Sequence, residues 1–560
     1  MNKSFWCATM ISTALVAGFA DVGPAQAQPG GPVDPVQLSD TVKVLASDDL
    51  EGRAPGTPGE AKTVAYLIAR MKGLGLQPGG EAGGWTQAVP LTHTQIGSAP
   101  VLTITGGGQD MALAQGQQIY ASTVRPVDRV KIEHAPLVFV GYGVSAPDRD
   151  WDDYKGVDLH GKIAVFLVND PDFEAQPSEP VAGKFGGKAM TYYGRWTYKY
   201  EEAARRGAVG ALIIHETAAA GYGWSTVVAP QGESYDIVRP ATGPQPILLQ
   251  GWVQRDVAAA MFRRAGLDLD AQKVLARTAG FRPVALGALR FSADLPVTHT
   301  QVASHNVLGR LPGARRPDET VMYSAHWDAY GVGAPDARGA TIRRGANDDG
   351  LGVAGVLEIA RAYARAPRPA RSVVFALWTA EERGLLGSET YAVHPLYPLA
   401  KTAANYTMDI LETAGPSRDV VLVGAGQDSL ETGLATAAAA QGRTVTPDSH
   451  PEKGLFYRAD HFSLAKRGVP TLLLMAIGGG PDLVQGGRAA GDMWVNDYTA
   501  NCYHKTCDAW SADWDLRGAA QDVDLLYDAG RKIADSDTWP TWNAGSEFKS
   551  VRAQSADARR

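Results

Sequence analysis

From residue 306 onward the chain alternates between short apolar runs and stretches with helical periodicity. This alternation is typical of an α/β fold, in which helices cover a sheet whose strands run largely parallel. We therefore predict a mixed, mostly parallel central sheet with helices on both faces. The predicted strands are 320–324, 372–377, 404–408, 420–423 and 471–475, and the predicted helices are 36–45, 58–74, 352–364, 430–440 and 516–534.

Histidine and carboxylate residues stand where several of these predicted strands end. In open α/β sheets, ligands collect in the crevice outside the carboxyl ends of the strands. Side chains that are distant in sequence are therefore expected to meet there. The residues at or just past strand ends are His326, Glu381, Glu382 and Asp409, while Asp348 lies in a loop before a helix.

The charges and the ligand types favour two zinc ions. Two divalent cations bring four positive charges, three carboxylates bring three negative charges, and a bridging hydroxide brings the fourth. Imidazole and carboxylate are suitable zinc ligands, and paired metals ~3.5–4 Å apart polarise a carbonyl and activate a water. We predict that one metal is held by His326, Asp348 and Asp409, and the other by Asp348, Glu382 and His504.

Glu381 is then left over as a general base, because adjacent residues at a strand end point in different directions. Asp328 stands two residues after His326 and is predicted to accept a hydrogen bond from its other ring nitrogen. Asp508 would do the same for the second histidine. Tyr503 is a candidate donor to the oxyanion that develops during hydrolysis.

Each of these residues also has an ordinary explanation. A single histidine is usually a core or surface residue, a pair of glutamates is usually solvated, and Asp348 and Asp349 could cap a helix. Their joint occurrence, in order and mostly at element ends, favours the metal site. For Asp460 and His461 we favour a supporting or substrate-pocket role over a third metal pair.

The motifs resemble those of the co-catalytic two-zinc aminopeptidases, the aminopeptidase Y and glutamate carboxypeptidase-like metallopeptidases, whose superfamily also includes the glutaminyl cyclases. The resemblance spans roughly 45–542 and implies two zinc ions with the ligand roles given above. It also implies that Glu381 is the base and that Tyr503 is the transition-state donor. The segments that carry it are His326-x-Asp328, Gly345-Ala346-x-Asp348-Asp349, Ala380-Glu381-Glu382-x-Gly384, Met408-Asp409, Tyr457-Arg458-Ala459-Asp460-His461 and Tyr503-His504.

A middle region rich in Gly, Pro, Trp and Tyr lacks such clustered carboxylates. It resembles a protease-associated domain through Val140-Gly141-Tyr142-Gly143, the strand at 161–165 and the segment 203–211. The alternative is a β-rich flank of the main domain. We predict a signal peptide at 1–27, an N-terminal part of the peptidase domain at 28–127, the insert at 128–290, the zinc peptidase domain at 291–545 and a polar, frayed tail at 546–560.

The first residues are typical of export. An apolar stretch from Phe5 to Ala20 is followed by Ala25-Gln26-Ala27, which fits a cleavage site. We expect a periplasmic or secreted protein without stable membrane association, and the alternative is an N-terminal membrane anchor. In an oxidising compartment Cys502 and Cys507 would form a disulfide, whereas a pair of thiolate zinc ligands would need further soft ligands.

The composition narrows the function further. A net charge of −7 gives no basic surface for nucleic acid. Neither Gly-x-Ser-x-Gly nor His-Glu-x-x-His occurs, which excludes serine α/β-hydrolases and helix-borne zinc proteases. We predict an aminopeptidase that acts on peptides. The alternatives are a carboxypeptidase with a cationic pocket from Arg343, Arg344 or Arg458, a glutaminyl cyclase, or a non-catalytic receptor-like relative.

Overall fold

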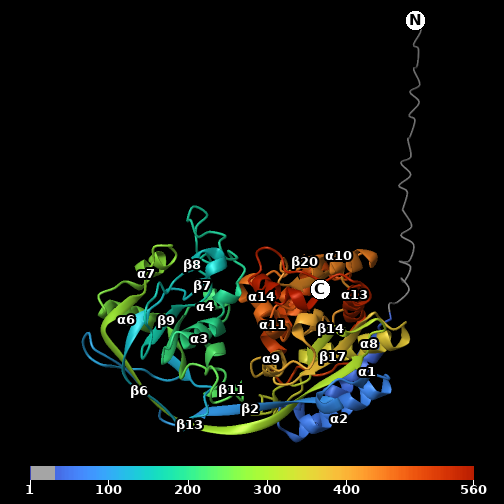
Figure 1. Ribbon diagram of the computed structural model, residues 1–560, viewed down its shortest axis with the longest axis horizontal. Coiled ribbons are helices and arrows are strands. Elements are labelled where there is room, and N and C mark those ends of the chain that lie inside the picture. Colours follow the sequence, from blue (N-terminus) through green and yellow to red (C-terminus); the bar gives the residue numbers. More distant parts are fainter. Residues whose placement is uncertain (2–31, 560) are drawn as a thin grey trace.

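The computed structural model describes residues 1 and 32–559, and the chain forms two lobes joined by long strands (Figure 1). Apart from Met1, the predicted signal peptide lies outside the described residues. One strand, β13 (Val284–Leu311), runs through both lobes and belongs to the sheet of each. The lobe with the predicted ligands contains the N-terminal helices and most residues after 296, and the second lobe contains the elements between.

The first lobe is built on the central sheet that the sequence predicts. Strands β21, β18, β14 and β17 are parallel neighbours in that order, and β13 pairs antiparallel with β17. At the other end β19 pairs antiparallel with β21 and parallel with β20. The mixed, mostly parallel fold class is therefore confirmed. The strands are β14 (Arg316–His326), β17 (Arg371–Trp378), β18 (Thr402–Met408), β19 (Asp419–Val423), β20 (Thr444–Pro447) and β21 (Thr471–Leu474).

Both faces of this sheet are covered by helices. Alternate residues of a strand point to opposite faces. In β17, Phe375 faces the cluster with α8 and α13, while Trp378 packs on Tyr391 of α9. The helices of this lobe are α1 (Pro35–Leu45), α2 (Pro58–Gly73), α8 (Gly352–Arg365), α9 (Leu386–Val393), α10 (Leu430–Ala440), α11 (His461–Ala465), α12 (Gly487–Asp497), α13 (Arg517–Asp535) and α14 (Lys549–Gln554).

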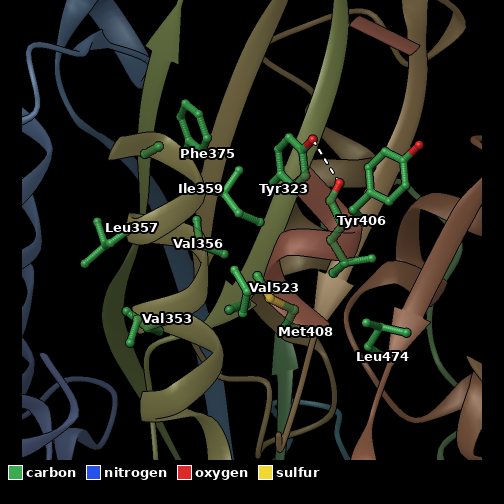
Figure 2. Packing of buried hydrophobic residues seen from close by; sticks show 14 of the residues in the cluster. Tyr323, Val353, Val356, Leu357, Ile359, Phe375, Tyr406, Met408, Leu474 and Val523 are labelled. Carbon is green, nitrogen blue, oxygen red and sulfur yellow. Dashed lines mark hydrogen bonds between the residues drawn. The ribbon is translucent and has the colours of Figure 1, made fainter. Parts of the chain in front are cut away.

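Helix α8 lies unusually close to the sheet beneath the predicted metal loop. Its apolar residues pack on β14, β17 and β18 and on Val523 of α13 (Figure 2). A Cβ added at Gly355 would lie 2.8 Å from Sδ of Met408 and 3.1 Å from Val523. A larger residue at this position would have to displace the Met408 side chain, and this packing fixes the start of α8 relative to the strand ends.

The second lobe has its own sheet and its own core. Its strand order is β5–β12–β10–β9–β6–β13–β3–β4, and β9 is parallel to β6 and β10. The strands are β3 (Val101–Thr105), β4 (Met111–Ala112), β5 (Ile119–Ser122), β6 (Arg129–Phe139), β9 (Ile163–Leu167), β10 (Gly210–His215) and β12 (Leu249–Gln254), with the separate pair β7 (Ser145–Ala146) and β8 (Trp151–Asp152). The helices are α3 (Trp196–Arg205), α4 (Thr217–Ala220), α5 (Trp224–Val228), α6 (Arg255–Arg264) and α7 (Leu269–Ala276).

Two strands connect the lobes as a continuous ribbon. β2 (Thr86–Ile96) pairs antiparallel with β13, from Thr86 opposite Val307 to Ile96 opposite Val297 without a register shift. Two short strands complete this part of the chain, and a two-stranded pair lies beside the predicted site. These are β1 (Gln77–Pro78) on β13, β11 (Glu233–Ile237) on β2, and β15 (Gly331–Val332) with β16 (Ile342–Arg343).

The end of the chain differs from its prediction as a frayed tail. It contains α14, and Phe548 and Arg552 are 2% and 6% exposed. Phe548 packs on Trp542, and the Arg552 guanidinium donates to the carbonyl of Thr402 at 3.0 Å. Within the described part of the chain, no helix has the length and apolar character needed to cross a membrane.

Candidate metal centre

Predicted ligands lie at the ends of β14, β17 and β18, which are neighbours at one edge of the sheet. β14 ends at His326, and Asp409 directly follows the last residue of β18. Glu381 and Glu382 lie in the turn after β17, three and four residues beyond Trp378. Because these strands are parallel, their carboxyl ends are neighbours, and the side chains meet as expected.

The side chains form two groups that share one carboxylate. In each group the candidate ligand atoms lie within 4.8 Å of one another. Nε2 of His326 lies 3.2 Å from Oδ1 of Asp348 and 4.0 Å from Oδ1 of Asp409. Nε2 of His504 lies 3.2 Å from Oδ2 of Asp348 and 3.2 Å from Oε2 of Glu382. The membership of the two groups is the same as in the two predicted ligand sets.

The shared residue, Asp348, is held by its backbone. Asp508 accepts hydrogen bonds from the N–H groups of Asn347 at 2.9 Å and of Asp348 at 3.1 Å. The following residue, Asp349, accepts from the N–H groups of His326 and Gly352 and so ties the loop to β14 and α8. The loop that carries this shared carboxylate is therefore fixed from both sides.

Asp508 thus has a different role from the one predicted for it. It was expected to orient His504, but both its oxygens accept from the Asp348 loop, and Oδ2 also accepts from the hydroxyl of Tyr498. Nδ1 of His504 lies 3.2 Å from the hydroxyl of Tyr330 instead. The loop needs an acceptor for two adjacent N–H groups, and sequence spacing gives no sign of that need.

Asp328 contacts both His326 and the residue predicted to be the base. The Asp328 carbonyl lies 3.2 Å from Nδ1 of His326, and its carboxylate Oδ1 lies 3.5 Å from the same nitrogen. Oδ1 also accepts a hydrogen bond of 3.0 Å from the backbone N–H of Glu381. The carboxylate therefore links the imidazole to the turn that carries Glu381. Oε2 of Glu381 lies 3.9 Å from Nε2 of His326, so Glu381 borders the first group.

The centre carries more buried negative charge than its histidines offset. Burial raises the pKa of Glu381 and of Glu382 well above the ordinary range, and a neighbouring carboxylate adds to each shift. Burial and the charge of Asp348 raise the pKa of Asp409 to about 8. Burial acts to lower the pKa of His326, but the surrounding carboxylates raise it well above its usual value. Such a cluster is suited to bound cations.

The donor atoms also fit a metal site individually. Oδ1 of Asp409 is buried without a hydrogen-bond donor among the described residues. Buried carboxylate oxygens usually have a partner, and a cation would supply one. Imidazole nitrogen and carboxylate oxygen are the ligand types of zinc. The residues present therefore fit a pair of such ions.

Two supporting features lie outside the ligand sets. Cys502 and Cys507 form the predicted disulfide and so bracket His504. The ring of Tyr503 lies 3.7 Å, centroid to centroid, from the ring of His504. Asp460 and His461 are buried nearby, but neither belongs to either candidate metal group of the described chain. A third metal pair is therefore not supported.

Sequence analysis missed Arg53, which fixes the loops around the centre. Its side chain is fully buried and donates four hydrogen bonds to backbone carbonyls. No motif marks an arginine whose partners are all backbone atoms, so its role was not predicted. The acceptors are the carbonyls of Leu45, Trp327, Arg344 and Gly345, at 2.8, 2.7, 2.5 and 2.8 Å.

Comparison with known proteins agrees with this geometry. Residues 306–527 match the sequence model described as Peptidase family M28 and contain every predicted ligand. The match is to a peptidase family, and it confirms the resemblance predicted from the sequence. The glutamate carboxypeptidase 2 homolog of Caenorhabditis briggsae is 34% identical over 113 residues, which are 19% of this chain and 13% of that protein.

Two further similarities extend the comparison. Aminopeptidase NAALADL1 of Rattus norvegicus is 36% identical over 108 residues, 18% of this chain and 13% of that protein. The chain thus spans about an eighth of the length of these curated relatives. Among solved structures, an aminopeptidase from Aneurinibacillus sp. strain AM-1 is 20% identical with a TM-score of 0.47, covering 90% of this chain and 94% of that one.

Proposed function

We propose that the protein is a two-zinc aminopeptidase that removes N-terminal residues from peptides. The observation that supports this most strongly is the pair of ligand groups that share Asp348. A site for a single cation would require only one of these ligand groups. If Asp348 only capped a helix, neither His326 nor His504 would need to lie beside it. The match of residues 306–527 to a peptidase family supports hydrolysis of peptide bonds.

In this proposal the ligands are the two predicted sets. His326, Asp348 and Asp409 would hold one zinc ion, and Asp348, Glu382 and His504 would hold the other. When bound, the pair supplies Lewis-acid polarisation of the scissile carbonyl and lowers the pKa of water.

Glu381 is proposed as the residue that moves the proton. It lies beside the first ligand group, is mostly buried, and is fixed through its N–H by Asp328. A carboxylate in that position takes a proton from the attacking water and delivers it to the leaving amine. Tyr503, next to His504, is proposed to donate to the oxyanion.

The surroundings favour a substrate with a free amino end. The excess of buried carboxylates, Glu381 among them, would stabilise a cationic α-amine close to the scissile bond. A cavity of about 290 Å³ adjoins the centre at Tyr330 and is lined also by Pro55, Tyr235 and Arg383. We propose that this cavity lies on the path of the substrate.

A carboxypeptidase is the second candidate, because of Arg458. Of the three arginines considered from the sequence, Arg344 pairs with Asp48 at 2.7 Å, and Arg343 donates to a backbone carbonyl. Arg458 makes no side-chain hydrogen bond or ion pair with any described residue. Hydrolysis of an N-acetylated peptide but not of a C-amidated one would favour this candidate over an aminopeptidase. Two complete ligand sets argue against a one-zinc glutaminyl cyclase and against a non-catalytic receptor.

The proposal for Glu381 is tested by Glu381→Gln, which keeps the size of the side chain and removes the base. We expect turnover of an aminoacyl anilide to fall by ~10²–10⁴-fold while zinc content stays constant. Glu133→Gln in the second lobe is the matched control, because Glu133 is exposed and remote from the centre. A Glu381→Gln enzyme with intact zinc and full turnover would refute the assignment.

Export and the second lobe belong to the same proposal. We propose that residues 1–27 are a signal peptide and that the protein works in the periplasm or outside the cell. The disulfide supports an oxidising compartment.

We also propose that the second lobe is a protease-associated insert, as predicted at 128–290. Its sheet includes β3, β4 and β5 as well, so the insert would start near residue 97.

A further inference from the structure

The imidazole of His504 is held by fewer contacts than that of His326. The side chain of His504 is 31% exposed, whereas that of His326 is 1% exposed. The backbone of His504 also has a φ of 62°, a left-handed conformation that is unfavourable for a residue other than glycine. Nδ1 of His326 lies beside the carbonyl and the carboxylate of Asp328. The second histidine therefore requires a partner of its own to fix its ring.

That partner is Tyr330. Its hydroxyl oxygen lies 3.2 Å from Nδ1 of His504, and the centres of the two rings are 4.7 Å apart. Among the described residues, Nδ1 of His504 has no other hydrogen-bond partner. A neutral histidine that presents Nε2 to a cation carries its proton on Nδ1, so the hydroxyl oxygen of Tyr330 would accept this hydrogen bond. Nε2 then faces Asp348 and Glu382, each at 3.2 Å.

The backbone around Tyr330 is itself firmly placed. Tyr330 directly precedes β15, which pairs with β16 to form a hairpin. A Cβ added at Gly331 would lie 2.6 Å from Cβ of Ala54, so the hairpin packs closely on the N-terminal part of the lobe. On the other side of Tyr330, the N–H of Ala329 donates to the carbonyl of Arg53 at 3.4 Å. The hydroxyl is therefore presented to the histidine from a fixed segment.

A guanidinium group lies near the ring of Tyr330. The guanidinium carbon of Arg383 is 5.3 Å from the centre of the Tyr330 ring and 5.0 Å from that of Tyr235, which are cation–π distances. Nη1 of Arg383 also lies 3.8 Å from Oε2 of Glu233. Glu233 and Tyr235 belong to β11, which pairs with β2 of the ribbon between the lobes. Because Arg383 directly follows Glu382, this contact also ties the turn of the second candidate ligand group to the ribbon.

We propose that Tyr330 is a positioning residue for His504, and that Arg383 holds the ring of Tyr330 against β11. The inference rests on the proposed function and assigns a support to the second zinc ion alone. A hydrogen bond to Nδ1 fixes the tautomer and the direction of the imidazole, which determines how well Nε2 binds a metal. If Tyr330 served only as a wall of the adjoining cavity, its hydroxyl would have no effect on zinc affinity.

The first test is Tyr330→Phe, which removes the hydroxyl and keeps the ring. Competition against a chromogenic chelator should show one zinc ion bound ~10–100-fold more weakly than in the native protein and the other ion unchanged. Tyr200→Phe is the matched control, because its hydroxyl donates to the carbonyl of Gly251 at 2.9 Å in the second lobe, and it should leave both affinities unchanged. Arg383→Met should weaken the same ion by a smaller factor, since the hydroxyl is kept, and a native affinity there would remove Arg383 from the inference. Native affinities for both ions in Tyr330→Phe would overturn the role of Tyr330.

Double variants identify the ion that depends on Tyr330. Glu382→Ala removes a ligand that belongs only to the second group, so adding Tyr330→Phe should leave the affinity of the remaining ion unchanged. Asp409→Ala removes a ligand that belongs only to the first group, so adding Tyr330→Phe should still weaken the remaining ion by ~10–100-fold. Equal losses in the two backgrounds, or the larger loss in Glu382→Ala, would overturn the inference.

Zinc affinity is measured without catalysis, so failure of this inference and failure of the proposed function can be told apart. A native protein that binds two ions but does not hydrolyse aminoacyl anilides would overturn the aminopeptidase, while the affinities of the variants would still decide the role of Tyr330. A native protein that hydrolyses them, with unchanged affinities in Tyr330→Phe, would overturn only that role. A native chain that binds fewer than two ions would overturn both.

Discussion

The backbone N–H of Glu381 donates a 3.0 Å hydrogen bond to the Asp328 carboxylate. This bond joins the turn after β17 to the segment after β14, so one side chain contacts both the turn of Glu381, the proposed base, and the imidazole of His326. The same carboxylate oxygen lies 3.5 Å from Nδ1 of His326. Asp328 is therefore a positioning residue for both groups.

Asp328→Ala should lower kcat by ~10–100-fold, because the turn that carries Glu381 loses its anchor and a small misplacement of a base is costly. Asp328→Asn should lose less, since its amide oxygen still accepts the N–H of Glu381. Steady-state kinetics on an aminoacyl anilide, with zinc content measured in parallel, checks this. Native kcat and native zinc content in the alanine variant would contradict the positioning role.

Asp508→Ala should weaken zinc binding by ~10–100-fold, because the N–H groups of Asn347 and Asp348 lose their acceptor and the carboxylate shared by the two ligand groups shifts. Competition against a chromogenic chelator measures the affinity. Asp513→Ala, which removes an exposed carboxylate from the same region, should leave the affinity unchanged. Equal affinities for the two variants would show that the Asp348 loop is held by other contacts.

Removing the disulfide should affect the site more than the global fold. The ring between Cys502 and Cys507 is small, and its loss should lower the free energy of unfolding by no more than about 2 kcal/mol. The double serine variant should lose zinc from the group that contains His504 first. Metal analysis and thermal unfolding check both points, and a variant with two tightly held ions would contradict the second.

Asp428 should make stability depend on pH away from the metal centre. Burial raises the pKa of Asp428 to about 8, although its carboxylate accepts from the N–H groups of Leu430 and Thr471. From about pH 4 to pH 8 the folded state holds a proton that the unfolded chain has lost. This contribution to stability is therefore lost as pH rises, by up to about 1.4 kcal/mol per pH unit.

Asp428→Asn removes the titrating group. The free energy of unfolding of the native protein, relative to that of the variant, should therefore fall as pH rises from 5 to 8. Urea unfolding of both proteins across this range, with zinc held constant, measures the difference. A difference that is independent of pH would mean that Asp428 is ionised throughout.

The strands and the ligand groups could be predicted from sequence because both depend on local signals. The second half of β14 and all of β17 and β18 are buried on both faces, and the ends of these strands carry predicted ligands. β13 could not be predicted as one element, because its polar residues and Pro296 resemble breaks between several strands. Only its pairing with β2 shows that one strand continues from lobe to lobe.

The supporting residues depend on contacts that no spacing reveals. Asp508 was expected beside His504, but the two N–H groups that it accepts from lie about 160 residues earlier. Arg53 carries no motif, and its role follows only from the backbone carbonyls that its buried side chain contacts. Long-range contacts of this kind are set by the tertiary structure.

The metal centre itself is tested by counting the zinc bound to protein purified without chelator. Two ions per chain are expected in the native protein, and Glu381→Gln should bind the same number because Glu381 belongs to neither candidate ligand group. Asp348→Ala should lose affinity for both ions, since Asp348 belongs to both groups. Fewer than one zinc ion per native chain would contradict the two-zinc site.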